Sequence, residues 1–246
     1  MLGLPDTVSV CLFDLDGVVT KTALVHAAAW KAMFDEFLAR QAAETGTKFV
    51  PFDQVREYDE YVDGKPRLDG TRAFLASRGI QLPEGDPSDP PGAPTIYGLS
   101  NQKNALVLKM IDKHGVEVYP GSVRYIERVR AAGRRTAVVS SSANTVQVLQ
   151  AAGITGLFDV RVDGVVAAQR GLAGKPAPDT YLAAARELGV PPPGAAVFED
   201  ALAGVEAGRA GGFGLVVGVN RTGQVRALRE HGADIVVDDL EELLDQ

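Results

Sequence analysis

The stretch Phe13-Asp14-Leu15-Asp16-Gly17-Val18-Val19-Thr20 ends an apolar run that begins at residue 8. Successive side chains of a strand point to opposite faces, so Asp14 and Asp16 can share one side. Gly17 allows the chain to turn where the strand stops, and Thr20 adds a hydroxyl nearby. Two carboxylates this close repel each other unless a cation or a proton lies between them. The stretch therefore indicates either a hard-metal site with one nucleophile and one proton carrier, or an ordinary Asp/Gly turn.

Composition excludes several classes of protein. The 246 residues, 46% of them hydrophobic and 23% charged, suit a globular chain of one large or two smaller domains. A net charge of −7 without a Lys/Arg cluster argues against nucleic-acid binding. The single cysteine, Cys11, lies in an apolar run, which excludes disulfides and cysteine metal sites. No basic leader or membrane-length apolar run occurs, so we expect a cytoplasmic protein without a membrane partner.

The first half of the chain reads as helical after its initial strand. Residues 22–40 carry apolar side chains every four positions, which predicts a long amphipathic helix. From there to about residue 113 we predict helices and loops without a strand. Residues 83–98 contain five prolines and are predicted to form an irregular loop.

After Gly115 the pattern changes to alternating helices and strands. The predicted strands are residues 135–140, 158–163, 195–198, 214–219 and 234–237, and the helices between them are residues 144–152, 179–188, 201–210 and 223–231. Repeated βα units predict an α/β fold, with a Rossmann-like parallel sheet covered by helices on both faces. Because the first strand can join this sheet, the helical block is an insertion. We predict a core domain of residues 1–20 and 114–246 and a helical cap domain of residues 21–113.

Polar side chains follow the predicted strands at their carboxyl ends, where open parallel sheets bind ligands. Ser140, Ser141 and Ser142 come before a helix, where their hydroxyls either hold phosphate oxygens or simply cap the helix. Glu199 and Asp200 follow another strand, either as metal ligands or as a favourable acidic helix start.

One lysine completes the set. Lys175 lies in the segment Gly174-Lys175-Pro176-Ala177-Pro178-Asp179, whose prolines stiffen the loop, although an exposed loop lysine is the simpler alternative. Carboxylates, hydroxyls and one cation at the same sheet edge predict a magnesium–phosphate site.

In this order the motifs resemble those of the haloacid dehalogenase superfamily of phosphotransferases. The matching pieces are FDLDGVVT, the Ser140 region, Lys175 in GKPAPD and Glu199-Asp200 in FEDALAG. The helical insertion resembles the cap of the superfamily's first subclass. The likeness is strongest to the β-phosphoglucomutase family, through His26-Ala27-Ala28-Ala29-Trp30-Lys31, Gly64-Lys65-Pro66-Arg67 and Ser140-Ser141-Ser142-Ala143-Asn144.

The resemblance implies roles for the core residues. Asp14 would be the nucleophile that becomes an aspartyl-phosphate, and Asp16 the general acid and base. Lys175 and Ser140 would neutralise and hydrogen-bond the transferring phosphoryl group. The implied Mg²⁺ ligands are Asp14, Asp16 through its backbone carbonyl, Asp200 and Glu199, the last either as a ligand or behind one.

The resemblance also implies substrate contacts. Arg67 would bind the distal phosphate of the substrate, a task suited to a planar guanidinium. His26 would orient Asp16, and Lys103 would reach in from a cap helix; the alternatives are a packed helix histidine and a solvated charge. The complete implied substrate-binding set is Thr20, His26, Arg67, Lys103, Ser141, Ser142 and Asn144.

The expected reaction is a transfer of phosphate between C1 and C6 of β-glucose phosphate through glucose 1,6-bisphosphate, which would also activate the enzyme. Ala143 stands where the family usually carries a lysine, and the loop of residues 83–98 has no clear counterpart, so substrate identity is less firmly indicated than reaction class. The alternatives are a hydrolase acting on a small sugar phosphate and a catalytically silent binding protein. We expect a monomer.

Overall fold

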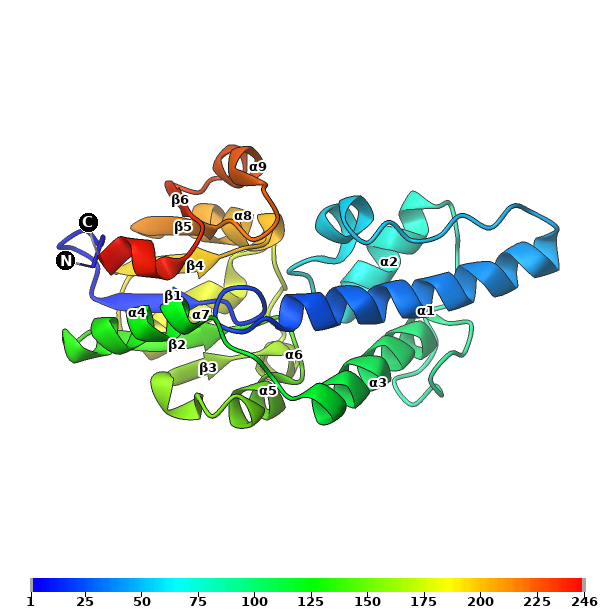
Figure 1. The fold of residues 1–246 in the computed structure, drawn as a ribbon, viewed down its shortest axis with the longest axis horizontal. Helices are drawn as coiled ribbons and strands as arrows, with labels where there is room; N and C mark the ends of the chain where they lie inside the picture. Colours follow the sequence, from blue (N-terminus) through cyan, green and yellow to red (C-terminus); the bar gives the residue numbers. More distant parts are fainter. Residues whose placement is uncertain (1, 245–246) are drawn as a thin grey trace. The chain divides into compact units, whose positions relative to one another are not determined.

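The computed structural model describes residues 2–244. Contacts divide the chain into two compact units: the first combines the chain up to Thr22 with the chain from Val116 onward, and the second is Ala23–Gly115. Each unit has its own set of elements in Figure 1. We call them the sheet unit and the helical unit.

The sheet unit contains a six-stranded sheet in the order β3-β2-β1-β4-β5-β6, with every neighbouring pair parallel (Figure 1). The strands are β1 (Val10–Phe13), β2 (Arg135–Val139), β3 (Val160–Val162), β4 (Ala195–Glu199), β5 (Leu215–Val219) and β6 (Ile235–Val237). The first strand of the chain is central, because Leu12 of β1 lies opposite Ala137 of β2 and Val197 of β4. The predicted α/β fold with a parallel sheet is confirmed.

The helices of the sheet unit are α4 (Pro120–Ala131), α5 (Thr145–Ala151), α6 (Gly164–Arg170), α7 (Asp179–Glu187), α8 (Leu202–Ala210) and α9 (Val225–Glu230). On one face of the sheet, Val10 and Leu12 share a buried cluster with Tyr181 of α7. On the other face, Phe13 stacks on Phe198 at 4.4 Å and meets Tyr125 of α4 at 6.3 Å between ring centroids. Alternation along β1 therefore supplies both faces of the core.

Two local predictions were wrong. The predicted strand of residues 158–163 is only Val160–Val162, and α6 follows it where no helix was predicted. The reason is Asp163, whose Oδ1 accepts hydrogen bonds from the N–H groups of Val165 (3.1 Å) and Val166 (2.9 Å) and so begins a helix. The first predicted helix also runs further than residue 40, to Thr45.

The helical unit is built from α1 (Thr22–Thr45), the π-helix η1 (Tyr58–Val62), α2 (Arg67–Ser77) and α3 (Ile96–His114). Its core is aromatic: the Phe34 ring lies 4.1 Å from Phe74 and 5.2 Å from Trp30. The proline-rich segment is irregular until Thr95, whose hydroxyl accepts the Gly98 N–H (2.9 Å) and begins α3 within the predicted loop. Among the helices of residues 2–244, none is both long and apolar enough to cross a membrane.

Candidate active site

The site begins at the turn that follows β1. The Asp14 N–H still donates to the Phe198 carbonyl (3.0 Å), so the first aspartate continues the edge of the sheet. Gly17 then adopts a φ of +103°, and a Cβ at this position would collide with the Asp200 carboxylate. Only glycine meets both conditions, and it brings the turn directly against the acidic segment after β4.

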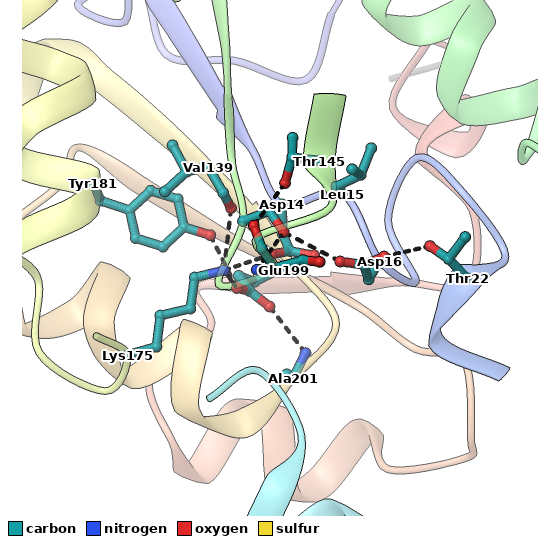
Figure 2. Close-up of polar contacts among 12 residues, drawn as sticks. Asp14, Leu15, Asp16, Thr22, Val139, Thr145, Lys175, Tyr181, Glu199 and Ala201 are labelled. Carbon is teal, nitrogen blue, oxygen red and sulfur yellow. Dashed lines mark hydrogen bonds and ion pairs between the residues drawn. The ribbon is translucent and has the colours of Figure 1, made fainter. Parts of the chain in front are cut away.

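A buried ion cluster joins this turn to the neighbouring strands (Figure 2). The Lys175 ammonium lies 2.5 Å from Asp14 Oδ1, contacts Glu199 Oε1, and donates to the Val139 carbonyl at 3.3 Å. Lys175 is only 3% exposed, so the alternative of an exposed loop lysine is wrong. The carboxylates predicted at the ends of β1 and β4 therefore meet at Lys175.

Burial and charge shift the protonation equilibria of this cluster. Burial raises the pKa of Asp14 well above its usual range, and the Glu199 and Asp16 charges add to this effect while Lys175 opposes it. Burial would lower the pKa of Lys175, but the Asp14 and Glu199 carboxylates outweigh burial and raise it. Lys175 is therefore an ammonium, and the carboxylates around it outnumber it, so an additional cation would be stabilised here.

The donor set fits a hard cation. Asp14, Glu199 and Asp200 each place one carboxylate oxygen within 4.8 Å of the others, and all three residues are buried. An all-oxygen, anionic set suits Mg²⁺ or Ca²⁺ rather than a softer metal. Glu199 differs from the other two: its Oε2 accepts the Ala201 N–H (3.0 Å) and its Oε1 accepts the Tyr181 hydroxyl (3.0 Å) besides Lys175. Asp14 and Asp200 are thus the better placed direct ligands, and Glu199 holds Lys175.

Asp16 points to a different set of partners from Asp14 (Figure 2). Its Oδ1 accepts the Thr22 hydroxyl, and its Oδ2 accepts the Ser140 hydroxyl at 3.2 Å. Sequence reasoning missed Thr22 because nothing distinguishes it from any other first residue of a helix. Thr20 was the hydroxyl that we predicted, but it is completely buried and donates to the Leu15 carbonyl (3.1 Å). The structure thus gives Thr20 a place inside the turn and does not favour substrate contact.

The serine loop after β2 is held by its own hydroxyls. Ser140 Oγ accepts the Ser142 N–H (3.1 Å), and Ser142 Oγ accepts the Asn144 N–H (3.1 Å). Asn144 then occupies the N-cap position of α5, and Ser141 lies between these residues in the loop. Ser142 thus forms a turn before α5 and does not cap the helix, whereas Ser140 also reaches Asp16.

The remaining predicted residues lie in the helical unit. Lys103 Nζ lies 2.6 Å from His26 Nδ1 and 4.8 Å from the Trp30 ring centroid, and Lys103 is 5% exposed. The solvated-charge alternative for Lys103 is therefore wrong. Arg67 donates to Asn104 Oδ1 at 3.5 Å, and its buried Nε has no hydrogen-bond partner within residues 2–244. Burial also lowers the pKa of Arg67, so an anion would stabilise this guanidinium.

Comparisons with known proteins agree with the fold. A family model described as haloacid dehalogenase-like hydrolase matches residues 8–212. The chain therefore belongs to the haloacid dehalogenase-like hydrolase family, and the predicted resemblance is confirmed.

Individual proteins of this family are similar to the chain over most of its length. The β-phosphoglucomutase of Mycobacterium bovis is 58% identical over 247 aligned residues, which cover 99% of this chain and 94% of the relative. The β-phosphoglucomutase of Bacillus subtilis is 31% identical over 92% of this chain and 87% of its own. The crystal structure of a Clostridium difficile β-phosphoglucomutase superposes with a TM-score of 0.73 and 25% identity, covering 96% of this chain and 93% of the other.

Proposed function

We propose that this protein is a β-phosphoglucomutase, which interconverts β-D-glucose 1-phosphate and glucose 6-phosphate. The observation that carries the proposal is the 58% identity over nearly the whole of both chains to a β-phosphoglucomutase. The paired geometry of Asp14 and Asp16 supports it, because the Asp14 carboxylate is bound to Lys175 and the Asp16 carboxylate accepts the hydroxyls of Thr22 and Ser140. Two such environments suit a nucleophile and a proton carrier, respectively.

In the first half of the proposed cycle, phosphorylated Asp14 transfers its phosphoryl group to the C6 hydroxyl of β-glucose 1-phosphate. The sugar oxygen attacks phosphorus while the bond to the Asp14 carboxylate breaks, and Asp16 takes the hydroxyl proton. The product is glucose 1,6-bisphosphate. Lys175 neutralises charge on the transferring group and on the Asp14 carboxylate that is released.

In the second half, the bisphosphate is bound in the opposite orientation. The Asp14 carboxylate attacks the phosphorus on C1, and Asp16 returns its proton to the departing C1 oxygen, so that glucose 6-phosphate is released and Asp14 is phosphorylated again. Glucose 1,6-bisphosphate is accordingly the proposed activator, because it can phosphorylate Asp14 at the start. Ser140 would orient Asp16 during both proton transfers.

The metal is proposed to be Mg²⁺, held by Asp14, Asp200 and the Asp16 backbone carbonyl, with Glu199 behind them. When bound, it would neutralise the phosphoryl oxygens and favour an in-line geometry. The acidic excess around Lys175 supports a cation at this position.

The helical unit is proposed to act as the cap that recognises the substrate. Arg67 would bind the distal phosphate, because its Nε lacks a protein partner in the described chain and its burial favours pairing with an anion. Lys103 and His26 would contribute as one hydrogen-bonded pair. Ser141, Ser142 and Asn144, in the loop after β2 of the sheet unit, are also proposed to bind the substrate. We also propose that the protein is a monomer and that it is located in the cytoplasm.

The experiment that tests this function uses β-glucose 1-phosphate with a catalytic amount of glucose 1,6-bisphosphate and Mg²⁺. We expect glucose 6-phosphate to accumulate, with little inorganic phosphate released. α-Glucose 1-phosphate serves as the control substrate and should not be converted. Release of phosphate without glucose 6-phosphate would instead identify a hydrolase that uses water as the final acceptor. Failure to phosphorylate Asp14 from any donor would favour a silent binding protein.

A further inference from the structure

The loop between β5 and α9 contains two side chains that no motif of the sequence singled out, Arg221 and Gln224. Arg221 is nearly enclosed, with 14% of its side chain exposed. It lies two residues after the end of β5, at the same edge of the sheet as the acidic residues. Two of its partners are backbone carbonyls of the turn after β1, more than two hundred residues away in sequence.

Arg221 anchors the turn that carries Asp16. Its Nε donates to the Gly17 carbonyl at 2.7 Å, and its Nη2 donates to the Val18 carbonyl at 3.3 Å. On its other edge, Nη1 donates to the Asp238 carbonyl at 2.8 Å. The planar guanidinium can donate hydrogen bonds to these three carbonyls at once, whereas a lysine ammonium in the same place could not reach all three.

The guanidinium is also fixed from one face. Its central carbon lies 3.5 Å from the centroid of the Tyr119 ring, a stacking contact. Tyr119 in turn donates its N–H to the Val19 carbonyl at 2.9 Å. The turn after Asp16 is thus held by hydrogen bonds from Arg221. It is also held by the backbone N–H of Tyr119, the residue on whose ring Arg221 stacks.

Gln224 anchors the second acidic segment. Its Nε2 donates to the Asp200 carbonyl at 3.0 Å. The same short loop therefore reaches the backbone of both the Asp16-Gly17 segment and Asp200. These two segments are in close contact, since even a Cβ at Gly17 would collide with the Asp200 carboxylate. A small shift of either segment would change the spacing of the oxygen atoms that face the cation.

We propose that Arg221 and Gln224 act as a clamp that sets the spacing between the Asp16 turn and Asp200. They are positioning residues, because they touch only the backbone of these segments. The clamp keeps the oxygen atoms of the two segments at the distances a small divalent cation requires, and it keeps Asp16 in line with the reacting oxygen. The proposed effect on the spacing of the oxygen atoms is argued from the contacts alone. The proposed effect on proton transfer by Asp16 rests on the proposed function.

The first measurement is binding of Mg²⁺ alone by calorimetry to the metal-stripped full chain. The variants are Arg221→Lys, which keeps the charge but loses the fork, and Gln224→Met, which keeps the length but loses the donor. We expect each to weaken Mg²⁺ binding by roughly tenfold, as for other groups that orient metal ligands. The matched control is Arg124→Lys: Arg124 also pairs with the C-terminal segment, at Glu241 (2.7 Å), but touches neither acidic segment.

The second measurement separates positioning from stability. In the mutase assay with saturating Mg²⁺, Arg221→Lys should lower kcat several-fold while KM stays near the wild-type value. Thermal unfolding of the metal-free proteins should show that Arg221→Lys and Gln224→Met stay folded at the assay temperature, as Arg124→Lys does. If Arg221→Lys does not fold, Gln224→Met still tests the clamp.

Two outcomes would overturn the clamp: unchanged Mg²⁺ affinity in both variants, or an equal loss of affinity in Arg124→Lys. A failure of the proposed function is a separate result, because the wild-type protein itself would then produce no glucose 6-phosphate while its Mg²⁺ titration could still be compared with those of the variants.

Discussion

The polar residues of the sheet unit and those of the helical unit are held in contrasting ways. In the sheet unit, Lys175 and Glu199 are almost completely buried, and both oxygens of Glu199 accept bonds from protein donors. In the helical unit, Arg67 has one long contact to Asn104 and a buried Nε that lacks a partner among residues 2–244. Lys175 and Glu199 of the sheet unit thus already have protein partners, whereas Arg67 of the helical unit keeps a donor for a ligand.

This contrast has a physical basis. Charge that develops during phosphoryl transfer is stabilised best by groups that do not have to reorganise, so their partners should be present before the substrate. Substrate recognition instead requires donors that exchange water or weak contacts for the ligand. On the proposed function, the sheet unit would carry the chemistry and Arg67 of the helical unit would recognise the substrate, and the variants below test that division.

The largest effect is expected for the sheet unit. Asp14→Asn should lower mutase activity by ~10⁴-fold or more, because the amide cannot act as the nucleophile. Mass spectrometry after incubation with glucose 1,6-bisphosphate should show a phosphorylated wild-type chain and no phosphorylated variant. Asp163→Asn is the matched control: Asp163 is also buried, at 1% exposure, but it caps α6 and pairs with Arg161 (3.0 Å), and asparagine keeps the cap. Activity of Asp14→Asn near the wild-type level would remove Asp14 from the mechanism.

The next effect concerns the helical unit. Arg67→Ala should lower kcat/KM for β-glucose 1-phosphate by about 10–100-fold, the usual consequence of losing a charge-assisted contact to an anion. The matched control is Arg72→Ala on the same helix, since Arg72 makes only exposed ion pairs with Asp69 and Glu84. Equal losses in both variants would indicate a general effect of positive charge on α2. No loss in Arg67→Ala would break the division between the two units.

A smaller effect tests how completely the sheet unit is organised. Tyr181→Phe keeps the ring next to Lys175 but removes the hydroxyl that donates to Glu199, so we expect a several-fold lower kcat. Tyr125→Phe is the matched control, because its buried hydroxyl donates to the Leu2 carbonyl (2.8 Å), away from the site. In urea unfolding, the free energy of unfolding of both variants should be lower by about 1 kcal/mol, the typical contribution of one hydrogen bond. A kcat equally reduced in both would mean that the hydroxyl matters only for stability.

The smallest effect is on pH-dependent stability within the helical unit. Burial opposes ionisation of Glu57, but bonds from Arg78 outweigh it and lower the pKa of Glu57 below its ordinary 4.5. Because the folded pKa is the lower one, this stabilisation is present above about pH 4.5 and is lost as the pH falls through the folded pKa.

The measurement is urea unfolding at pH 7 and pH 4, with Glu57→Gln and the exposed Glu44→Gln as control. At pH 7, Glu57→Gln should be less stable by about 1 kcal/mol, and the difference should shrink at pH 4. Glu44→Gln should have the same free energy of unfolding as the wild type at both pH values. A Glu57→Gln deficit that grows in acid would contradict the direction of the shift.

Much of the sheet unit could be predicted because its signals are local. Short continuous apolar runs with turn residues after them indicate buried strands, and the carboxyl ends of parallel strands lie at one edge of the sheet. Asp14, Lys175, Glu199 and Asp200 could therefore be grouped before any coordinates, and the structure does bring them together. The helix α6 was missed because its signal, an aspartate that caps two N–H groups, also occurs at the end of many strands.

The sequence by itself determined the order of the elements and the chemical types at the sheet edge, since both depend on neighbours along the chain. Only the tertiary structure decided the partners: Tyr181 for Glu199, Thr22 for Asp16, and Arg221 for the Gly17 carbonyl, which lies 204 positions away in sequence. A tyrosine in a helix and an arginine in a loop carry no local mark of such contacts. Their roles arise from packing that brings together segments far apart in the sequence. A buried polar atom needs a hydrogen-bond partner, and the fold determines which group is close enough to supply it.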